Sequence, residues 1–223
     1  MHTPILLAIL ALLILVLCTG CQETDGASIS LPRGSPVVVD GTIEPDEWAP
    51  AHRETFADGS ELLLMGAQGT LYLAIRSSTP DMIVGNVYLN QGDEIRILHT
   101  SAALSTAVYR REGDHWQQAQ AFDWRCRRTD DGDAARAERD AFFQDEGWVS
   151  ANSRVGAPNE LEYQIELPGG PLRLAVNHIK ASDTDTKLPW PRDLDDDCVR
   201  PTPGGLPEQM HFTPERWVSI DVP

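Results

Sequence analysis

Short stretches of alternating hydrophobic and polar residues run along most of the chain after residue 36. Alternation of this kind is typical of β-strands that bury one face. Glycine-containing turns such as Gln68-Gly69 and Pro168-Gly169-Gly170 separate several of the stretches, as hairpins require. The pattern predicts an all-β chain folded as a two-sheet antiparallel β-sandwich. The expected strands are 37–40, 61–66, 70–76, 83–89, 93–99, 104–111, 148–155, 160–167, 172–178 and 216–222.

One segment carries helical features instead. Residues 134–143 are rich in alanine and charged residues, with Asp130, Asp131 and Asp133 before them and Gly147 after them. Carboxylates favour the positive end of a helix dipole, so this acidic cluster is explained as capping. The sandwich is therefore expected to contain one short inserted helix. Residues 183–209, rich in Pro, Asp and Gly, are expected to form a long loop.

The N-terminus carries a run of a different kind. Its first twenty residues contain no charged side chain, and residues 5–17 are continuously apolar. This run is shorter than the roughly 20 residues that span a bilayer. It fits the roughly 7 to 15 residues of a signal-peptide core, so residues 1–20 are predicted to be a signal peptide.

The run ends in Leu17-Cys18-Thr19-Gly20-Cys21, followed by Gln22. This segment resembles the lipobox of bacterial lipoproteins, although Cys18 stands at a normally apolar position and the preceding residues include no Lys or Arg. The resemblance implies a diacylglycerol thioether on Cys21, cleavage before it, and an outer membrane location facing the periplasm or the cell surface. The alternative is an ordinary cleaved signal with an incidental cysteine. Residues 21–36 are then expected to be a tether, and residues 37–223 the domain.

Export also bears on the other cysteines. Cys18 leaves with the signal and Cys21 is lipidated, which leaves Cys126 and Cys198. An oxidising compartment favours a disulfide between them, which would close a loop of about 70 residues and contribute about 4 kcal/mol. The alternative is two separate buried thiols. Metal binding by this pair is disfavoured, because no C-x-x-C spacing is present.

The chain is strongly acidic, with 34 Asp and Glu against 18 Lys and Arg and a formal net charge of -16. Such a surface disfavours nucleic acid as a partner. Acidity is also a common solubility device, so it identifies no ligand by itself.

A second resemblance begins at residues 39–51, which contain Asp40-Gly41 and, after a short acidic turn, Trp48. They resemble the opening of family 9 carbohydrate-binding modules and of DOMON-like domains. Segments 69–75, 92–97, 147–151 and 161–168 resemble later strands of the same families. The resemblance implies a β-sandwich that binds sugars in its best-known members and haem in some DOMON relatives. We expect Trp48 itself to pack in the core.

Sugar binding requires flat aromatic faces beside hydrogen-bonding groups. The candidates are Trp116, Trp124 and Trp190, with Asp193 as a polar partner. Trp190 is the leading candidate, because it stands between two prolines in the expected loop. The alternative is that all three indoles pack inside the sandwich.

The acidic run with Asp193, Asp195 and Asp197 is a candidate calcium site, since hard cations prefer carboxylate oxygens. A solvated acidic loop is the alternative. Haem would need axial ligands, and the sequence offers these without distinguishing a pair: His99, His178, Met65, Met82, Met210 and His211. No hydrolase, metalloprotease or nucleotide-binding motif is present, which favours a binding module over an enzyme. The sequence therefore predicts a carbohydrate-binding lipoprotein without catalysis; the alternatives are a haem-binding electron-transfer module and a structural envelope lipoprotein.

Overall fold

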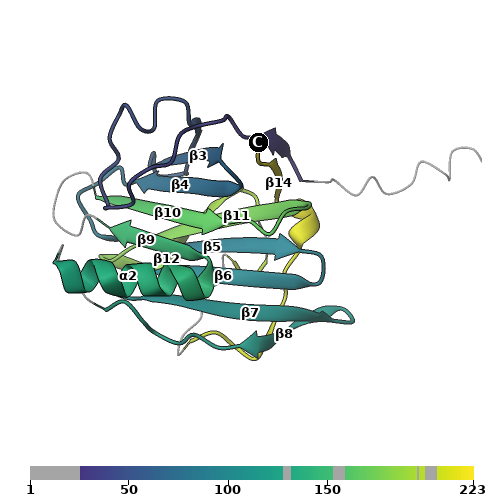
Figure 1. Ribbon diagram of the computed structural model, residues 1–223. Helices are drawn as coiled ribbons and strands as arrows, with labels where there is room; N and C mark the ends of the chain where they lie inside the picture. The colour runs from purple at the N-terminus through teal and green to yellow at the C-terminus, as the bar shows by residue number, and fades with distance from the viewer. Residues whose placement is uncertain (1–25, 128–131, 153–158, 195, 199–204) are drawn as a thin grey trace, which may run out of the picture.

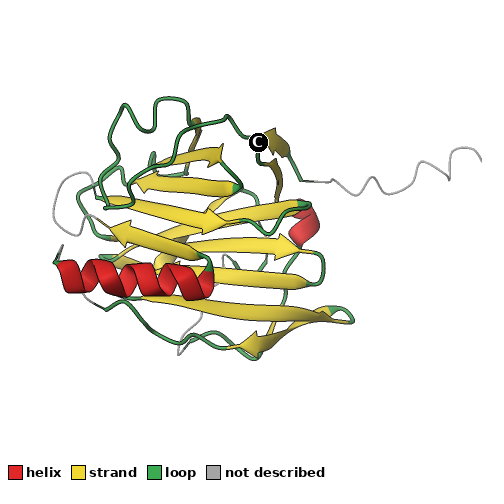
Figure 2. Cartoon of the chain, in the orientation of Figure 1, coloured by secondary structure: helices red, strands yellow, loops and turns green. Residues whose placement is uncertain are grey.

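The computed structural model describes residues 26–127, 132–152, 159–194, 196–198 and 205–223. Two β-sheets face each other, and one helix lies along the side of the molecule (Figures 1 and 2). The predicted two-sheet β-sandwich with one inserted helix is confirmed. The signal peptide and the lipidation site Cys21 lie outside the described residues. No helix within the described ranges is long and apolar enough to cross a membrane.

The larger sheet has nine strands, and all its pairs are antiparallel except β1 with β14. One edge of β11 pairs with β5, and the other pairs with β14 and then β12. In spatial order its strands are β1 (Ser28–Ser30), β14 (Val218–Asp221), β11 (Leu172–Lys180), β5 (Ile83–Gln91), β6 (Glu94–Thr100), β7 (Leu104–Glu112), β8 (His115–Gln120) and β13 (Gln209–Met210), with β12 (Asp183–Trp190) beside β11.

The smaller sheet is a five-stranded antiparallel sheet. Its strands in order are β2 (His52–Thr55), β3 (Glu61–Ala67), β4 (Thr70–Arg76), β10 (Glu160–Glu166) and β9 (Trp148–Asn152). The helix α2 (Asp133–Glu146) leads into β9, and the short 3-10 helix η1 (Pro214–Arg216) leads into β14.

The main core fills the space between the sheets with aliphatic side chains from both. Among its aromatic members, Trp148 and Tyr163 are stacked, and the Trp148 indole N–H donates to Thr106 Oγ1 at 2.8 Å. Burying the N–H with an acceptor avoids the cost of an unpaired polar group, so this indole can sit fully inside.

The outer side of the smaller sheet is covered by the segment before β2, which Figure 1 shows crossing over β3 and β4. A fully buried carboxylate, Glu162 on β10, accepts the Trp48 indole N–H at 2.9 Å and the Gly41 backbone N–H at 2.9 Å. Gly41 has a φ of 89°, which favours glycine. The structure thus brings together residues 40–48 and β10, two segments that carried the second sequence resemblance, and Trp48 packs in the core as expected.

The outer side of the larger sheet is covered by the segment between β12 and β14. Phe212 and Trp217 from this segment pack on Tyr88 and Tyr109. Asp196, fully buried, accepts the Trp217 indole N–H at 2.9 Å and so holds the segment in place. The described residues therefore form three hydrophobic layers, and the central one lies between the sheets.

Most expected strands are confirmed, including 70–76 with its bounds. Residues 37–40 form no strand, because the segment crosses the outer side of the smaller sheet without pairing. The expected loop 183–209 contains β12, whose pairing with β11 overrides a composition poor in strand formers. The helix is longer than expected, and its N-cap is Gly132 with no side-chain cap bond, so only Asp133 stands in the first turn. Asp130 and Asp131 lie outside the described residues.

The expected tether is docked where the structure describes it. Ser28–Ser30 pairs with β14, Leu31 is buried in the main core, and Arg33 bridges to Gly66. Residues 28–33 therefore pack on the sandwich, ahead of the predicted boundary at residue 37.

The expected disulfide is wrong in this structure. Cys126 and Cys198 are both free and buried. Cys126 belongs to the central core, whereas Cys198 belongs to the layer on the outer side of the larger sheet. The sheet separates the two thiols, so the alternative of two separate buried thiols is the correct one.

Candidate functional site

The candidate site is built on residues 121–127, which follow β8. Leu104 and Arg125 form an isolated antiparallel bridge, with N–H to O distances of 2.8 and 2.9 Å in the two directions. Side chains alternate across a strand-like pairing. The bridge therefore directs Trp124 and Phe122 to one side of the pairing and Arg125 to the other.

On that side three rings form one cluster. The centroids of His99 and Trp124 are 5.0 Å apart, those of Phe122 and Trp124 are 5.0 Å apart, and those of His99 and Phe122 are 5.4 Å apart. Trp124 is 39% exposed. Among the described residues, it is one of two large hydrophobic side chains that are exposed, the other being Val38. The cluster thus holds an exposed indole against two supporting rings.

A polar row on the larger sheet fixes the position of His99. Asn177 on β11, Asn86 on β5 and His99 on β6 are direct cross-strand partners. His99 Nδ1 lies 2.7 Å from Asn86 Oδ1, and Asn86 Nδ2 donates to Asn177 Oδ1 at 2.9 Å. Because Asn86 Oδ1 is an acceptor, Nδ1 carries the ring proton. Burial lowers the pKa of His99 to about 4, so this ring is neutral at pH 7.

Beside the indole lies a hollow of about 330 Å³, called here the Trp124 hollow. This volume falls in the range of small-ligand sites. Its lining combines two aromatic rings with charged groups: Trp124, Arg125, Cys126, Arg127, Glu138, Ala141, Phe142 and Asp145. Phe142 is buried, so the accessible ring face is that of Trp124. This face and hydrogen-bonding groups occur together in one concave surface, which is the chemistry that sugar binding requires.

The Arg125 guanidinium organises the wall made by α2. It lies over the Phe142 ring at 4.8 Å and donates to Asp145 Oδ2 at 3.0 Å and to Glu146 Oε1. Cys126 Sγ donates to the Glu138 carbonyl at 3.4 Å. Burial raises the pKa of the Cys126 thiol to about 11, so this cysteine is not a reactive thiolate at neutral pH.

The other two predicted sugar-binding indoles are buried. Trp190 is 5% exposed and packs in the central core, and Trp116 is 3% exposed and donates to the Phe212 carbonyl at 3.2 Å. Neither presents a ring face to solvent. Trp190, the leading sugar-binding candidate from the sequence, therefore has no exposed face on which a sugar could stack. Asp193 is not among the residues that line the Trp124 hollow, and its carbonyl accepts from Arg216. Of the predicted set, only Trp124 belongs to the candidate site.

The acidic run lies in the segment between β12 and β14, and two of its carboxylates hold that segment in its fold. Asp196 and Asp197 accept backbone N–H groups, from Cys198 at 2.9 Å and from His211 at 2.6 Å respectively. Asp195 lies outside the described residues. Within the described part of the chain, no group of three or more His, Cys, Asp or Glu side chains could hold a metal ion. The calcium site from Asp193, Asp195 and Asp197 stays a prediction without structural support.

The candidate haem ligands are dispersed. His99 lies on the outer side of the larger sheet, whereas His178 is fully buried against Phe56 between the sheets. Met65 is fully buried under the N-terminal segment, and Met210 is buried in the outer layer. Met82 is half-buried and His211 is exposed, both outside these clusters. The two histidines face opposite sides of one sheet and cannot be axial ligands of the same haem.

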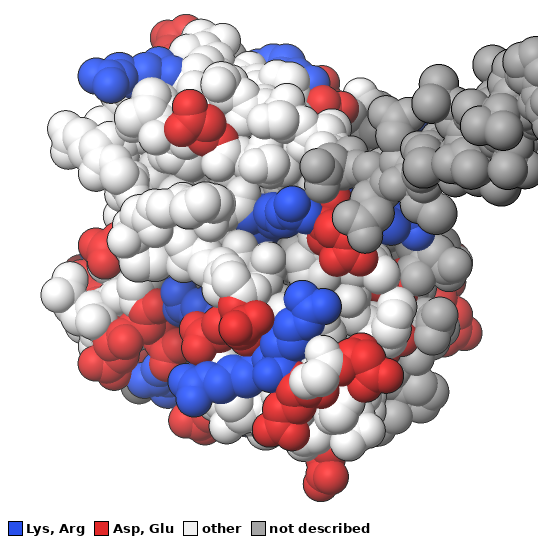
Figure 3. All heavy atoms as spheres, turned by 90° about the vertical axis from the view of Figure 1, so that its right-hand side faces the viewer, with Lys and Arg blue, Asp and Glu red and all other residues white. Residues whose placement is uncertain are grey.

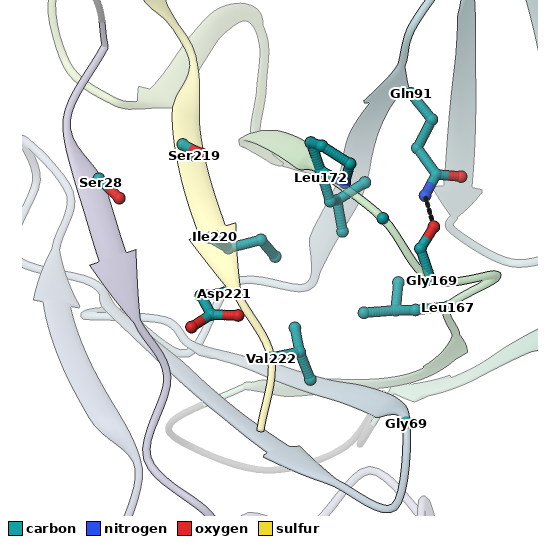
Figure 4. A pocket seen from close by; sticks show the side chains of 12 residues that line it. Ser28, Gly69, Gln91, Leu167, Gly169, Leu172, Ser219, Ile220, Asp221 and Val222 are labelled. Carbon is teal, nitrogen blue, oxygen red and sulfur yellow. Dashed lines mark hydrogen bonds between the residues drawn. The ribbon is translucent and has the colours of Figure 1, made fainter.

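A second pocket, of about 480 Å³, opens at the end of the sandwich beside β14 (Figure 4). Leu167, Leu172, Ile220 and Val222 surround its opening, and Gln91 donates to the Gly169 carbonyl at 3.3 Å. None of its lining residues is aromatic. It therefore lacks the stacking surface that distinguishes the Trp124 hollow.

Acidity does not mark a site on the face shown in Figure 3. Acidic and basic side chains are interspersed over that face, more densely over its lower half than over its upper half. The net charge of -16 is therefore not gathered into one patch on that side.

Sequence reasoning missed most of the Trp124 hollow. Arg125, Phe142 and Asp145 come from two segments that meet only through the β7 bridge and the packing of α2. The one available signal was the alternation in Phe122-Asp-Trp124, which is typical of an exposed strand edge.

No known family matches the sequence, and no curated protein matches it. Two solved structures are similar to the chain. A family 9 carbohydrate binding module from Caldicellulosiruptor kristjanssonii in complex with cellotriose is 16% identical with a TM-score of 0.44, and the match covers 87% of this chain and 93% of that one. A protein from Bacteroides uniformis, described as carbohydrate-binding, is 12% identical with a TM-score of 0.47, and the match covers 88% of this chain and all of the other. Because both TM-scores are below 0.5, neither likeness identifies a site or a ligand.

Proposed function

We propose that this protein binds carbohydrate in the Trp124 hollow, without catalysis. The observation that carries the proposal is the exposed Trp124 indole at the rim of a concave surface lined by charged groups. Aromatic rings that form sugar sites stack on the apolar C–H face of the ring, while neighbouring polar groups accept and donate to its hydroxyls. Arg125, Arg127, Glu138 and Asp145 are the candidate polar groups.

Two rings pack against Trp124, which favours a ligand-binding role for this indole over incidental exposure of a core residue. Phe122 and His99 hold the indole from the side, and the hydrogen bond to Asn86 fixes the His99 ring. A ring held in this way loses little conformational entropy when a ligand stacks on it.

The test is a screen of the full-length protein on a glycan array, followed by affinity electrophoresis in gels that contain the best polysaccharide. We expect retardation that Trp124→Ala weakens at least 10-fold. Val38→Thr, the matched control at the other exposed hydrophobic position, should leave retardation unchanged. Absence of any binding glycan, or equal retardation of Trp124→Ala, would reject the site.

We also propose that the protein is a lipoprotein anchored through Cys21 to the outer membrane. The support is the lipobox-like sequence before Gln22. Labelled palmitate should enter the protein in growing cells and should not enter Cys21→Ser. Recovery of unlabelled full-length protein from the cytosol would contradict the proposal.

A further inference from the structure

A chain of hydrogen bonds joins the segment between β12 and β14 to the ring cluster of the candidate site. Its members, Asn177, Asn86 and His99, are neighbours on three adjacent strands of the larger sheet, β11, β5 and β6. At one end of the chain, Asn177 Nδ2 donates to the Cys198 carbonyl. Asn177 is fully buried and Asn86 is 7% exposed, so both amides depend on their neighbours in the chain for hydrogen bonds.

The Cys198 carbonyl fixes the direction of every bond in this chain. A carbonyl can only accept, so Asn177 turns its Nδ2 toward Cys198 and its Oδ1 toward Asn86. Asn86 then donates through Nδ2 at 2.9 Å and turns its Oδ1 toward His99, whose Nδ1 lies 2.7 Å away. The neutral His99 ring is thereby held as the Nδ1–H tautomer. Its Nε2 has no hydrogen-bond partner among the described residues.

Trp124 depends on ring contacts for its orientation. Its indole N–H has no hydrogen-bond partner in the described part of the chain, unlike that of the buried Trp148. The indole is held by an edge-on contact with His99, with ring planes at 87°, and by a tilted contact with Phe122. The χ2 torsion of histidine has broad minima. The bond to Asn86 is therefore what keeps the His99 ring at the angle that this contact requires.

We propose that Asn86 is a positioning residue of the Trp124 site, which sets the affinity of the site by holding His99 against the indole. Asn86 does not line the Trp124 hollow, so it acts without touching the ligand. The inference rests on the proposed carbohydrate binding. A ring that is held in place loses little conformational freedom when a ligand stacks on it, so a loosened ring binds more weakly. Because the chain ends at the Cys198 carbonyl, the placement of the segment between β12 and β14 is linked to the site.

The test compares Asn86→Leu with the matched control Asn90→Leu. Asn90 lies on the same strand and is 8% exposed, but its Nδ2 donates outside the chain, to the Gly92 and Glu94 carbonyls. Both variants should lose thermal stability. In affinity electrophoresis, Asn86→Leu should weaken glycan retardation at least 5-fold relative to Asn90→Leu. Asn86→Asp keeps the acceptor for His99 and, at alkaline pH, should bind more tightly than Asn86→Leu.

Two NMR readouts need no glycan. Long-range proton–nitrogen spectra should show the Nδ1–H tautomer of His99 in the unsubstituted protein and in Asn90→Leu, and a mixture of tautomers in Asn86→Leu. Nuclear Overhauser contacts between the His99 and Trp124 rings should weaken in Asn86→Leu alone.

An Nε2–H tautomer in the unsubstituted protein would overturn the proposal. Ring contacts or glycan retardation that are the same in Asn86→Leu and Asn90→Leu would overturn it as well. Absence of any binding glycan would instead reject the proposed function, and the ring contacts would still decide whether Asn86 positions Trp124.

Discussion

Trp48→Phe tests how the N-terminal segment is attached to the smaller sheet. The indole N–H donates to Glu162 Oε1 at 2.9 Å, and both side chains are fully buried. Phenylalanine keeps an aromatic ring at the position but removes the donor and part of the ring volume. The carboxylate then loses one of its three N–H donors, the others being the backbone groups of Asp40 and Gly41.

The magnitude follows from two contributions. Burial raises the pKa of Glu162 to about 7, so unfolding is measured above that pH, where the side chain is a carboxylate. A hydrogen bond to such a buried charged group contributes about 1.5 to 3 kcal/mol, and the smaller ring leaves a void that costs about 1 kcal/mol more. We expect the free energy of unfolding to fall by about 3 kcal/mol, a large part of the total for a single domain. The melting temperature should fall by about 10 °C for a domain of this size.

The assay is urea unfolding followed by far-ultraviolet circular dichroism. Trp124→Phe is the control, because it makes the same chemical change at an exposed position, and it should change the free energy of unfolding by less than about 0.5 kcal/mol. A double-mutant cycle with Glu162→Leu isolates the coupling between the two side chains. A loss below about 1 kcal/mol for Trp48→Phe, or no coupling in the cycle, would refute the role assigned to this bond.

Three further predictions concern the interior. Neither ring nitrogen of His178 has a hydrogen-bond partner among the described residues. Burial lowers the pKa of His178 to about 4, although the nearby Asp58 carboxylate acts in the opposite direction. The stability that the neutral ring contributes is therefore present above about pH 6.5 and is lost as the pH falls toward 4. His178→Leu should therefore lose less stability than the unsubstituted protein between pH 6.5 and 4.5 in urea unfolding, and an identical pH profile would show that another group controls acid unfolding. Gly85→Ala should destabilise by about 2 kcal/mol, because its Cβ would lie 2.3 Å from the Tyr163 hydroxyl; an unchanged melting temperature would contradict this packing. Cys126 and Cys198 should both react with a thiol reagent in denaturant without reductant. Unreacted cysteines and a protein mass lower by about 2 Da, the mass of the two hydrogen atoms lost on oxidation, would show a disulfide instead.

The strands were predictable because alternation and turn residues are local. Residues 70–76 form an apolar run that is buried on both faces, with Leu71, Leu73 and Ile75 in the central core and Tyr72 and Ala74 under the N-terminal segment. The strand β12 was not predictable, because its residues Asp183–Trp190 form a strand through pairing with β11, a partner that the local sequence does not reveal. Residues 37–40 show the converse, because their sequence is strand-like but they pair with no strand among the described residues.

The site was predictable only in part. Trp124 could be proposed from the chemistry of sugar binding, but its exposure depends on the bridge between Leu104 and Arg125. Trp190 was preferred because prolines flank it, yet β12 carries it into the central core. The cysteine pairing failed because both cysteines lie in segments outside the strands, and the side of the larger sheet on which such a segment packs is a tertiary property that the local sequence does not reveal.

The most direct test of the central claim follows the six tryptophan indole N–H signals by NMR while a glycan selected on the array is added. Replacement by phenylalanine assigns the signal of Trp124. We expect this signal to shift most and those of the buried Trp116 and Trp190 to stay in place. Saturable binding that leaves the Trp124 signal unmoved would show that the glycan binds elsewhere.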